Sequence, residues 1–157
     1  MKKIVTYFLI SLFTVLAGCA VQPKSTKTAL ELQAIQSKEF QTSKKVAFAS
    51  TLSVFQDLGY VVNSASIETG LINAKSPTQQ SIVPFVGQVM KDVKATAFVE
   101  EITPGRTKIR LNFVNSTQSS SGYGMRGEQD IPIEEADVYQ NVFTKIQQGI
   151  FVRKNVN

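Results

Sequence analysis

The stretch from Ser43 to Tyr60, SKKVAFASTLSVFQDLGY, carries the strongest secondary-structure signal in the chain. Ser43 belongs to the residue types that cap helix N-termini, and Gly59 can supply the left-handed conformation that ends many helices. Between them, apolar side chains recur at the spacing of one helical face, namely Val46, Phe48, Ala49, Leu52, Phe55 and Leu58. The stretch therefore predicts an amphipathic helix that must be buried against another apolar surface.

Two pairs of segments with alternating side chains predict antiparallel hairpins that could provide this surface. The first pair spans 60–65 and 71–75, and the second spans 94–102 and 107–115. Three apolar side chains of the last segment share one face, and polar ones take the other. These apolar residues are Ile109, Leu111 and Phe113.

A closing helix is predicted over 133–152, with acidic residues in its first turn, where the helix dipole favours them. Its apolar face comprises Tyr139, Val142, Phe143, Ile146 and Ile150, and the acidic residues are Glu134, Glu135 and Asp137.

Three remaining segments have weaker patterns. Alternation over 30–40 favours a strand, with a helix over 29–38 as the alternative. The segment 78–93 reads as an irregular linker with a short helix near 84–91, because Pro84 and Gly87 interrupt it. Its apolar residues are expected to cover the core, and a loop facing lipid or a partner is the alternative. Residues 116–127 read as a polar loop.

This order of elements predicts an α+β domain. We expect an antiparallel sheet of four to five strands with two helices packed on one face. A helix-grip or TATA-binding-protein-like topology is the preferred arrangement.

The first nineteen residues predict where the protein goes. Two lysines precede an apolar run from Ile4 to Val15, which is shorter than the roughly 20 residues that cross a bilayer as a helix. The run is typical of a secretory signal. Leu16-Ala17-Gly18-Cys19 follows it and resembles the lipobox of bacterial lipoproteins. The resemblance implies cleavage before Cys19 and acylation of that residue, so that the membrane partner is reached through acyl chains.

This resemblance divides the chain into a signal peptide at 1–18, a lipidated tether at 19–29 and one domain at 30–157. Ala20 stands where an aspartate in lipoproteins of enteric bacteria resembles an inner-membrane retention signal. By that analogy the protein is expected at the outer membrane, with its domain facing the periplasm.

Composition argues against several classes of function. The chain has no histidine and one cysteine, which excludes Ser-His and Cys-His nucleophilic sets and the usual nitrogen and sulfur zinc ligands. Glu100 and Glu101 are adjacent in a predicted strand and point to opposite faces. We therefore expect no enzyme activity, no cofactor and no metal. Nucleic acid is not expected as a partner either, because the net charge of +5 falls to +3 when Lys2 and Lys3 leave with the signal.

Two groups of residues are candidates for contact with a partner. Tyr123, Met125 and Arg126 lie in the polar loop and are residue types enriched at protein interfaces. Lys108 and Arg110, with Lys94 on the pairing strand, could form a basic stripe on the open face of the sheet. A mobile loop and an ordinary solvated face are the alternatives. Gly122, Gly124 and Gly127 match a dinucleotide-binding pattern, but no strand–turn–helix context is predicted around them.

Two further segments, FQDLGY at 55–60 and GLINA at 70–74, resemble a motif of small proteobacterial lipoproteins. More loosely, the plan of a helix followed by a hairpin is similar to domains of the lipoprotein subunit of the outer-membrane β-barrel assembly machine. These residues cap and pack elements, so the resemblance implies a fold and not an activity.

The leading hypothesis is a non-enzymatic accessory or structural component of an envelope assembly or secretion complex, with an envelope protein as its partner. The alternative is a lipoprotein that binds a small molecule, a lipid or a glycan. A deep apolar cleft would favour the alternative, whereas a filled core with an exposed edge strand would favour the leading hypothesis.

Overall fold

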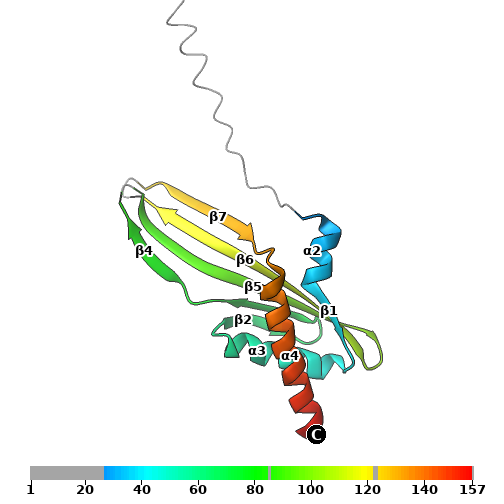
Figure 1. Cartoon of the computed structure of the whole chain (residues 1–157). Helices are drawn as coiled ribbons and strands as arrows, with labels where there is room; N and C mark the ends of the chain where they lie inside the picture. Colours follow the sequence, from blue (N-terminus) through cyan, green and yellow to red (C-terminus); the bar gives the residue numbers. More distant parts are fainter. Residues whose placement is uncertain (1–26, 85, 122–123, 157) are drawn as a thin grey trace, which may run out of the picture.

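A computed structural model describes residues 27–84, 86–121 and 124–156 of the chain (Figure 1). Its centre is one long antiparallel hairpin of β5 (Gly87–Thr103) and β6 (Arg106–Ser120). The two strands pair from Gln88 opposite Ser120 to Thr103 opposite Arg106. Strands of this length are about three times the usual five to six residues. Each of them therefore has room for two different neighbours along its outer edge.

The half of the hairpin nearest its turn forms the five-stranded part of the sheet. Here β1 (Ser37–Phe40) pairs with β6, while β3 (Leu71–Lys75) pairs with β5, and β2 (Val61–Ser66) pairs with β3. The order across the sheet is β1-β6-β5-β3-β2, and all pairs are antiparallel.

The other half of the hairpin has different neighbours. β4 (Gln79–Val83) pairs with residues 87–91 of β5, and β7 (Arg126–Pro132) pairs with residues 114–120 of β6. We call this four-stranded part, made of β4, β7 and residues 87–93 and 114–120, the sheet extension. It projects past the helices in Figure 1.

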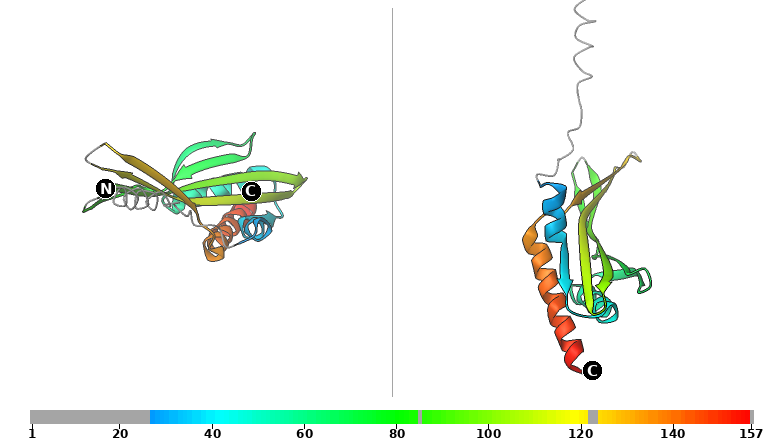
Figure 2. Two further views of the ribbon diagram at one scale, coloured as in Figure 1. Left: turned by 90° about the horizontal axis from the view of Figure 1, so that it is seen from above. Right: turned by 90° about the vertical axis from the view of Figure 1, so that its right-hand side faces the viewer.

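Two helices cover one face of the five-stranded part. α3 (Lys44–Asp57) and α4 (Ala136–Val156) pack on each other and on the sheet, and α2 (Ala29–Gln36) lies beside α4 (Figure 2). The predicted apolar face of the closing helix is confirmed, because all five of its residues are buried. The sheet contributes Ile72, Ala95, Ala97, Val99, Ile109, Leu111 and Phe113 to the same core.

Tyr139 of α4 joins three segments at the centre of this core. Its hydroxyl donates a hydrogen bond of 2.7 Å to the Ile133 carbonyl oxygen and accepts longer bonds from the Gln36 side chain and the Phe113 backbone N–H. Its ring lies 5.3 Å from that of Phe113, which in turn contacts Phe55 and Tyr60. Aromatic rings thus fill the space between sheet and helices.

The predicted helix of 43–59 is confirmed, but its buried face is rotated from the prediction. Phe48 and Phe55 are buried as expected, whereas Leu58 is 37% exposed. Ser50 and Thr51, which the apolar pattern left out, are fully buried. The reason is that α3 faces α4 as well as the sheet, and small side chains allow two helices to approach closely. A Cβ added at Gly149 of α4 would lie only 3.4 Å from the Cβ of Ser50.

The strand favoured over 30–40 is wrong for most of its length. Residues 29–36 are helical, and only residues 37–40 form a strand. A capping box begins the helix: the Thr28 hydroxyl accepts from the Glu31 N–H, and the Glu31 carboxylate accepts from the Thr28 N–H at 2.7 Å. These reciprocal bonds satisfy backbone donors at the helix start.

The predictions of an irregular linker at 78–93 and of a loop at 116–127 are also wrong, because both segments are largely β-structure. In the first segment, Pro84 and Gly87 lie at or beside the β4–β5 turn rather than in a helix. The predicted α+β class and antiparallel sheet are confirmed. The expected four to five strands and two helices are too few, because the described residues contain seven strands and three helices.

Gly70 is a position where the fold requires glycine. Its φ is +76°, and a Cβ there would overlap the Val99 carbonyl oxygen, whereas Gly105 has φ +78° with nothing within 4 Å. We expect Gly105→Ala to lower the free energy of unfolding by about 1 kcal/mol for backbone strain. Gly70→Ala adds a backbone collision and should cost about 3 kcal/mol. Urea denaturation of the two variants measures the difference, and equal costs would contradict the close approach of β3 to β5.

Candidate functional site

The sheet extension is the most accessible regular structure in the described chain. Every residue of β4 and β7 is exposed. Each of these strands has a single strand neighbour within the described residues, β5 for β4 and β6 for β7. An edge strand with one neighbour presents a row of backbone N–H and C=O groups that can pair with another chain. The extension therefore offers two edges for a partner strand.

Lys94 holds one of these edges in place. Its ammonium nitrogen lies 2.8 Å from Asp130 Oδ2 and 3.2 Å from Glu128 Oε1, both on β7. The pKa of Lys94 is raised, chiefly by the hydrogen bond to Asp130 and next by the hydrogen bond to Glu128. The hydrogen bond from Lys94 in turn lowers the pKa of Asp130. Lys94 therefore serves β7 and does not join the predicted basic stripe.

An ion pair between a buried aspartate and a partly exposed lysine marks the point where the extension meets the covered part of the sheet. The Asp92 side chain is only 3% exposed, and its Oδ1 lies 3.2 Å from Lys75 Nζ. Beside it, Val93 and Ser76 exchange two hydrogen bonds of 2.8 and 2.9 Å. Because a buried carboxylate is stable only when paired, Lys75 fixes the end of β3 to β5 where the chain crosses to β4.

Two hollows lie on the extension and its base. The larger, of about 670 Å³, is lined by β5, β6 and β7 residues that include Gln88, Met90 and Glu128. The second, of about 400 Å³, lies around Asp92, Lys91 and Asn115. Both open to solvent and have mixed polar linings, so their shape suits a partner's surface or a polar ligand better than an apolar ligand.

The structure divides the predicted contact residues into two groups. Met125 and Arg126 lie at the tip of the extension, and Tyr123 and Cys19 lie outside the described residues. Lys108 and Arg110 lie on the covered part of the sheet. Arg126 pairs with Ser120, which is ten residues, or about 33 Å of strand, from Arg110. One small partner surface could not contact both groups.

The basic stripe is also interrupted by acidic residues. In the strand register, Lys108 lies opposite Glu100 of β5 and Glu39 of β1. Only Arg110, opposite Phe98 and Ser37, has uncharged residues on both sides. The mixed charge favours the alternative of an ordinary solvated face over the basic stripe.

The exposed apolar residues at the tip contradict the favoured interpretation of residues 78–93 and leave the alternative of an outward-facing segment. Ile82 is 85% exposed and Val86 is 46% exposed, although residues 78–93 were expected to cover the core. The available signal was the pair of turn residues Pro84 and Gly87, which follow a short polar and β-branched run as in a hairpin.

Other candidate chemistry finds no support in the geometry. Of the glycine-rich pattern, Gly124 lies between the antiparallel strands β6 and β7 and Gly127 lies within β7, so neither is at a helix start. No three histidine, cysteine, aspartate or glutamate side chains gather in a way that could hold a metal within residues 27–84, 86–121 and 124–156. The helices found over the same ranges are too short or too polar to cross a membrane.

Comparison with known proteins gives only distant structural likenesses. No protein-family model and no curated protein matches the sequence. Among solved structures, the crystal structure of a DUF4468 family protein from Bacteroides ovatus ATCC 8483 is similar over 73% of this chain and 84% of that one. The sequence identity is 10% and the TM-score is 0.39.

We expect Lys94→Met to loosen β7 specifically. Removal of the ammonium leaves Asp130 and Glu128 without their shared partner. Loss of an exposed ion pair of this kind raises the equilibrium constant for local opening by up to about threefold. Hydrogen exchange should show β7 amides losing about that factor in protection. Lys91→Met, at an exposed lysine of the same strand, is the matched control and should leave β7 unchanged.

Acid should act on the same contact. The pKa of Asp130 is lowered from 3.8 in the folded chain, so its stabilising effect is present above pH 3.8 and is lost as the pH falls through the lower folded value. Protection of β7 should therefore fall in strong acid in the native protein and respond less in Lys94→Met. An identical acid response in both proteins would show that this pair does not hold the edge.

Proposed function

We propose that this chain is a lipoprotein anchored to the outer membrane through Cys19, with its domain in the periplasm. Its role is that of a non-enzymatic accessory or structural component of an envelope assembly or secretion complex. The observation that carries the proposal is the sheet extension, whose two exposed edge strands lie at the end of the domain where the tether enters.

The position of the tether supports this arrangement. Lys27, the first described residue, donates a hydrogen bond through its side chain to the Glu134 carbonyl oxygen, just before α4. In both Figure 1 and the right view of Figure 2, the start of α2 and the tip of the extension lie at the same end of the domain. The C-terminal end of α4 lies at the opposite end. A tether of about eight residues from Cys19 therefore keeps the extension close to the membrane.

Pairing of a partner strand with β4 or β7 is the recognition mode that fits these edges. In strand addition, backbone hydrogen bonds supply affinity and alternate side chains supply specificity. The filled aromatic core around Tyr139 and Phe113 favours this mode over a ligand enclosed between sheet and helices. The sequence has no histidine, the commonest general acid–base residue, which is compatible with a non-enzymatic role.

We also propose a helix-grip or TATA-binding-protein-like topology for the covered part of the domain. If α2, β4 and β7 are set aside, the chain runs strand, helix, four strands, helix, and the sheet order is β1-β6-β5-β3-β2. On this proposal the extension is an addition to a common scaffold.

Cys19→Ser should remove the anchor. Without a thiol there is no site for the thioether that carries the diacylglycerol, and stable membrane attachment depends on several acyl chains. We expect the native protein to float with membranes and its N-terminal peptide to carry lipid in mass spectrometry. The variant should lack the lipid mass. Native protein with an unmodified cysteine at position 19, or with residues 1–18 still attached, would contradict the proposal.

Photo-crosslinking from the edges tests the partner. A photoreactive residue at Gln80 of β4 or Gln129 of β7 should give a discrete crosslinked envelope protein in intact cells. The matched control is Gln148, an exposed glutamine of α4 on the covered part of the domain. Crosslinks of equal yield from all three positions, or from none, would count against recognition through the edges.

A further inference from the structure

We infer that the tip of the sheet extension inserts apolar side chains into the headgroup region of the same membrane that holds the lipid anchor. The inference rests on the proposed anchor at Cys19 and adds a second membrane contact to it. The tip residues are Ile82, Val83, Val86 and Met125, with exposed fractions of 85%, 38%, 46% and 72%.

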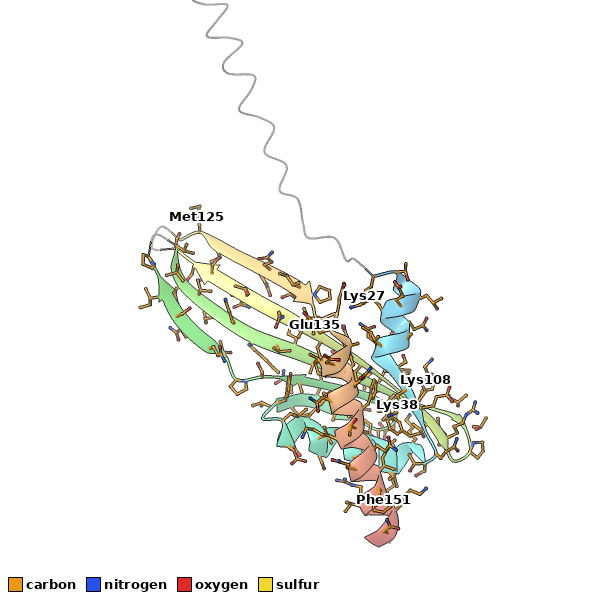
Figure 3. All side chains as sticks on the ribbon, viewed as in Figure 1. Lys27, Lys38, Lys108, Met125, Glu135 and Phe151 are labelled. Atoms are coloured by element: carbon orange, nitrogen blue, oxygen red, sulfur yellow. The ribbon has the colours of Figure 1, made fainter. Side chains whose placement is uncertain are left out.

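Strand register brings these residues together from two separate turns. Val83 pairs with Gly87, Gln88 pairs with Ser120, and Ser120 pairs with Arg126. The β4–β5 turn and the β6–β7 turn therefore end side by side. Hydrogen bonds close both of them, from the Val86 N–H to the Val83 carbonyl at 3.2 Å and from the Ser121 N–H to the Met125 carbonyl at 2.9 Å. These four apolar side chains thus lie beside hydrogen-bonded residues at one end of the molecule (Figure 3).

The length of chain before Lys27 allows the tip and the anchor to reach one membrane. Arg126 at the tip and Glu134, where Lys27 is bound, are eight residues apart along the chain, or at most about 26 Å. The eight residue-to-residue steps from Cys19 to Lys27 span up to about 28 Å. A lipid on Cys19 can therefore lie at the level of the tip while Lys27 keeps its contact with Glu134.

The size and charge of the tip fit a lipid surface. A stable protein interface buries about 800 Å² on each partner, which is more than a few side chains on two turns can supply. Shallow insertion of such side chains is sufficient when a second anchor already holds the protein at the membrane. Arg126 flanks the apolar residues and can meet anionic headgroups, while the acidic Glu128 lies two residues farther from the tip and is paired with Lys94.

Insertion of the tip would set the orientation of the whole domain. Figure 3 places Met125 at the tip and Phe151 near the opposite end of the molecule. With the tip in the membrane, β4 and β7 stand upright from the lipid surface and their edges face sideways, toward proteins in the same membrane. The second membrane contact would therefore fix the orientation of β4 and β7 relative to the membrane, which the tether alone leaves free.

The test places an environment-sensitive fluorophore on the mature, lipidated protein by Met125→Cys, and by Phe151→Cys as the control. Phe151 is also apolar and is 68% exposed. The proteins are reconstituted into vesicles of phosphatidylethanolamine and phosphatidylglycerol that contain a nitroxide-labelled lipid. We expect quenching at position 125 to exceed that at position 151 by about threefold or more, because only the tip reaches the headgroup region. Adding Ile82→Asp to Met125→Cys should reduce the quenching toward the control value.

Flotation of the same vesicles separates the two possible failures. Protein that does not float lacks its anchor, which would overturn the proposed function itself. Protein that floats while positions 125 and 151 are quenched equally would overturn the membrane contact alone. The label at position 125 could also be shielded in intact cells but remain in water on vesicles that contain no other protein. This result would overturn the membrane contact too, since another protein would then cover the tip in cells.

Discussion

The continuous pairing of β5 with β6 is the constraint on which the rest of the structure depends. The pairing fixes which residues of both strands face the helices, so that Ala95, Ala97 and Val99 meet Phe113, Leu111 and Ile109 in register on the buried face. Because side chains alternate strictly along a strand, a slip of one residue would expose this whole set. The same pairing continues past the helices and supports β4 and β7, which have no other strand to hold them in the described chain. Core and extension are therefore two halves of one hairpin.

The covered half could be predicted from sequence because one of its faces is apolar and the other is polar. Ile109, Leu111 and Phe113 give a clear period of two, and Tyr139, Val142 and Ile146 give the period of a helix. The start of α2 carried a recognisable signal as well, since Thr28 and Glu31 have the spacing of a capping box. The short alternating run after it outweighed that signal. Ser50 and Thr51 could not be assigned to the core, because their burial depends on a helix almost a hundred residues away.

The extension has no such signal, for a physical reason. Both faces of β4 and β7 are exposed to solvent, so no apolar set needs to recur every second residue in Gln79–Val83 or Arg126–Pro132. What specifies these strands is pairing to β5 and β6, which is a tertiary contact. The sequence could therefore identify Met125 and Arg126 as candidate contact residues by type, but it could not show that Lys108 and Arg110 lie far from them. It also could not show that Ile82 and Val86 join Met125 at one tip.

A sheet whose two outer strands are exposed throughout gains little there from hydrophobic burial, and so these strands need other contacts to stay ordered. Here polar contacts supply them. Asp92 is buried against Lys75 at the base, and Lys94 reaches across to Asp130 and Glu128 on β7. Exposed edges also carry a risk of unwanted strand pairing. The acidic pair on β7 and the terminal Pro132 reduce that risk on one edge, but β4 has neither charge nor proline along its five residues. The less protected edge is thus β4, which ends at the apolar tip, and on the proposed arrangement beside a membrane it is the edge that a neighbouring envelope protein would meet.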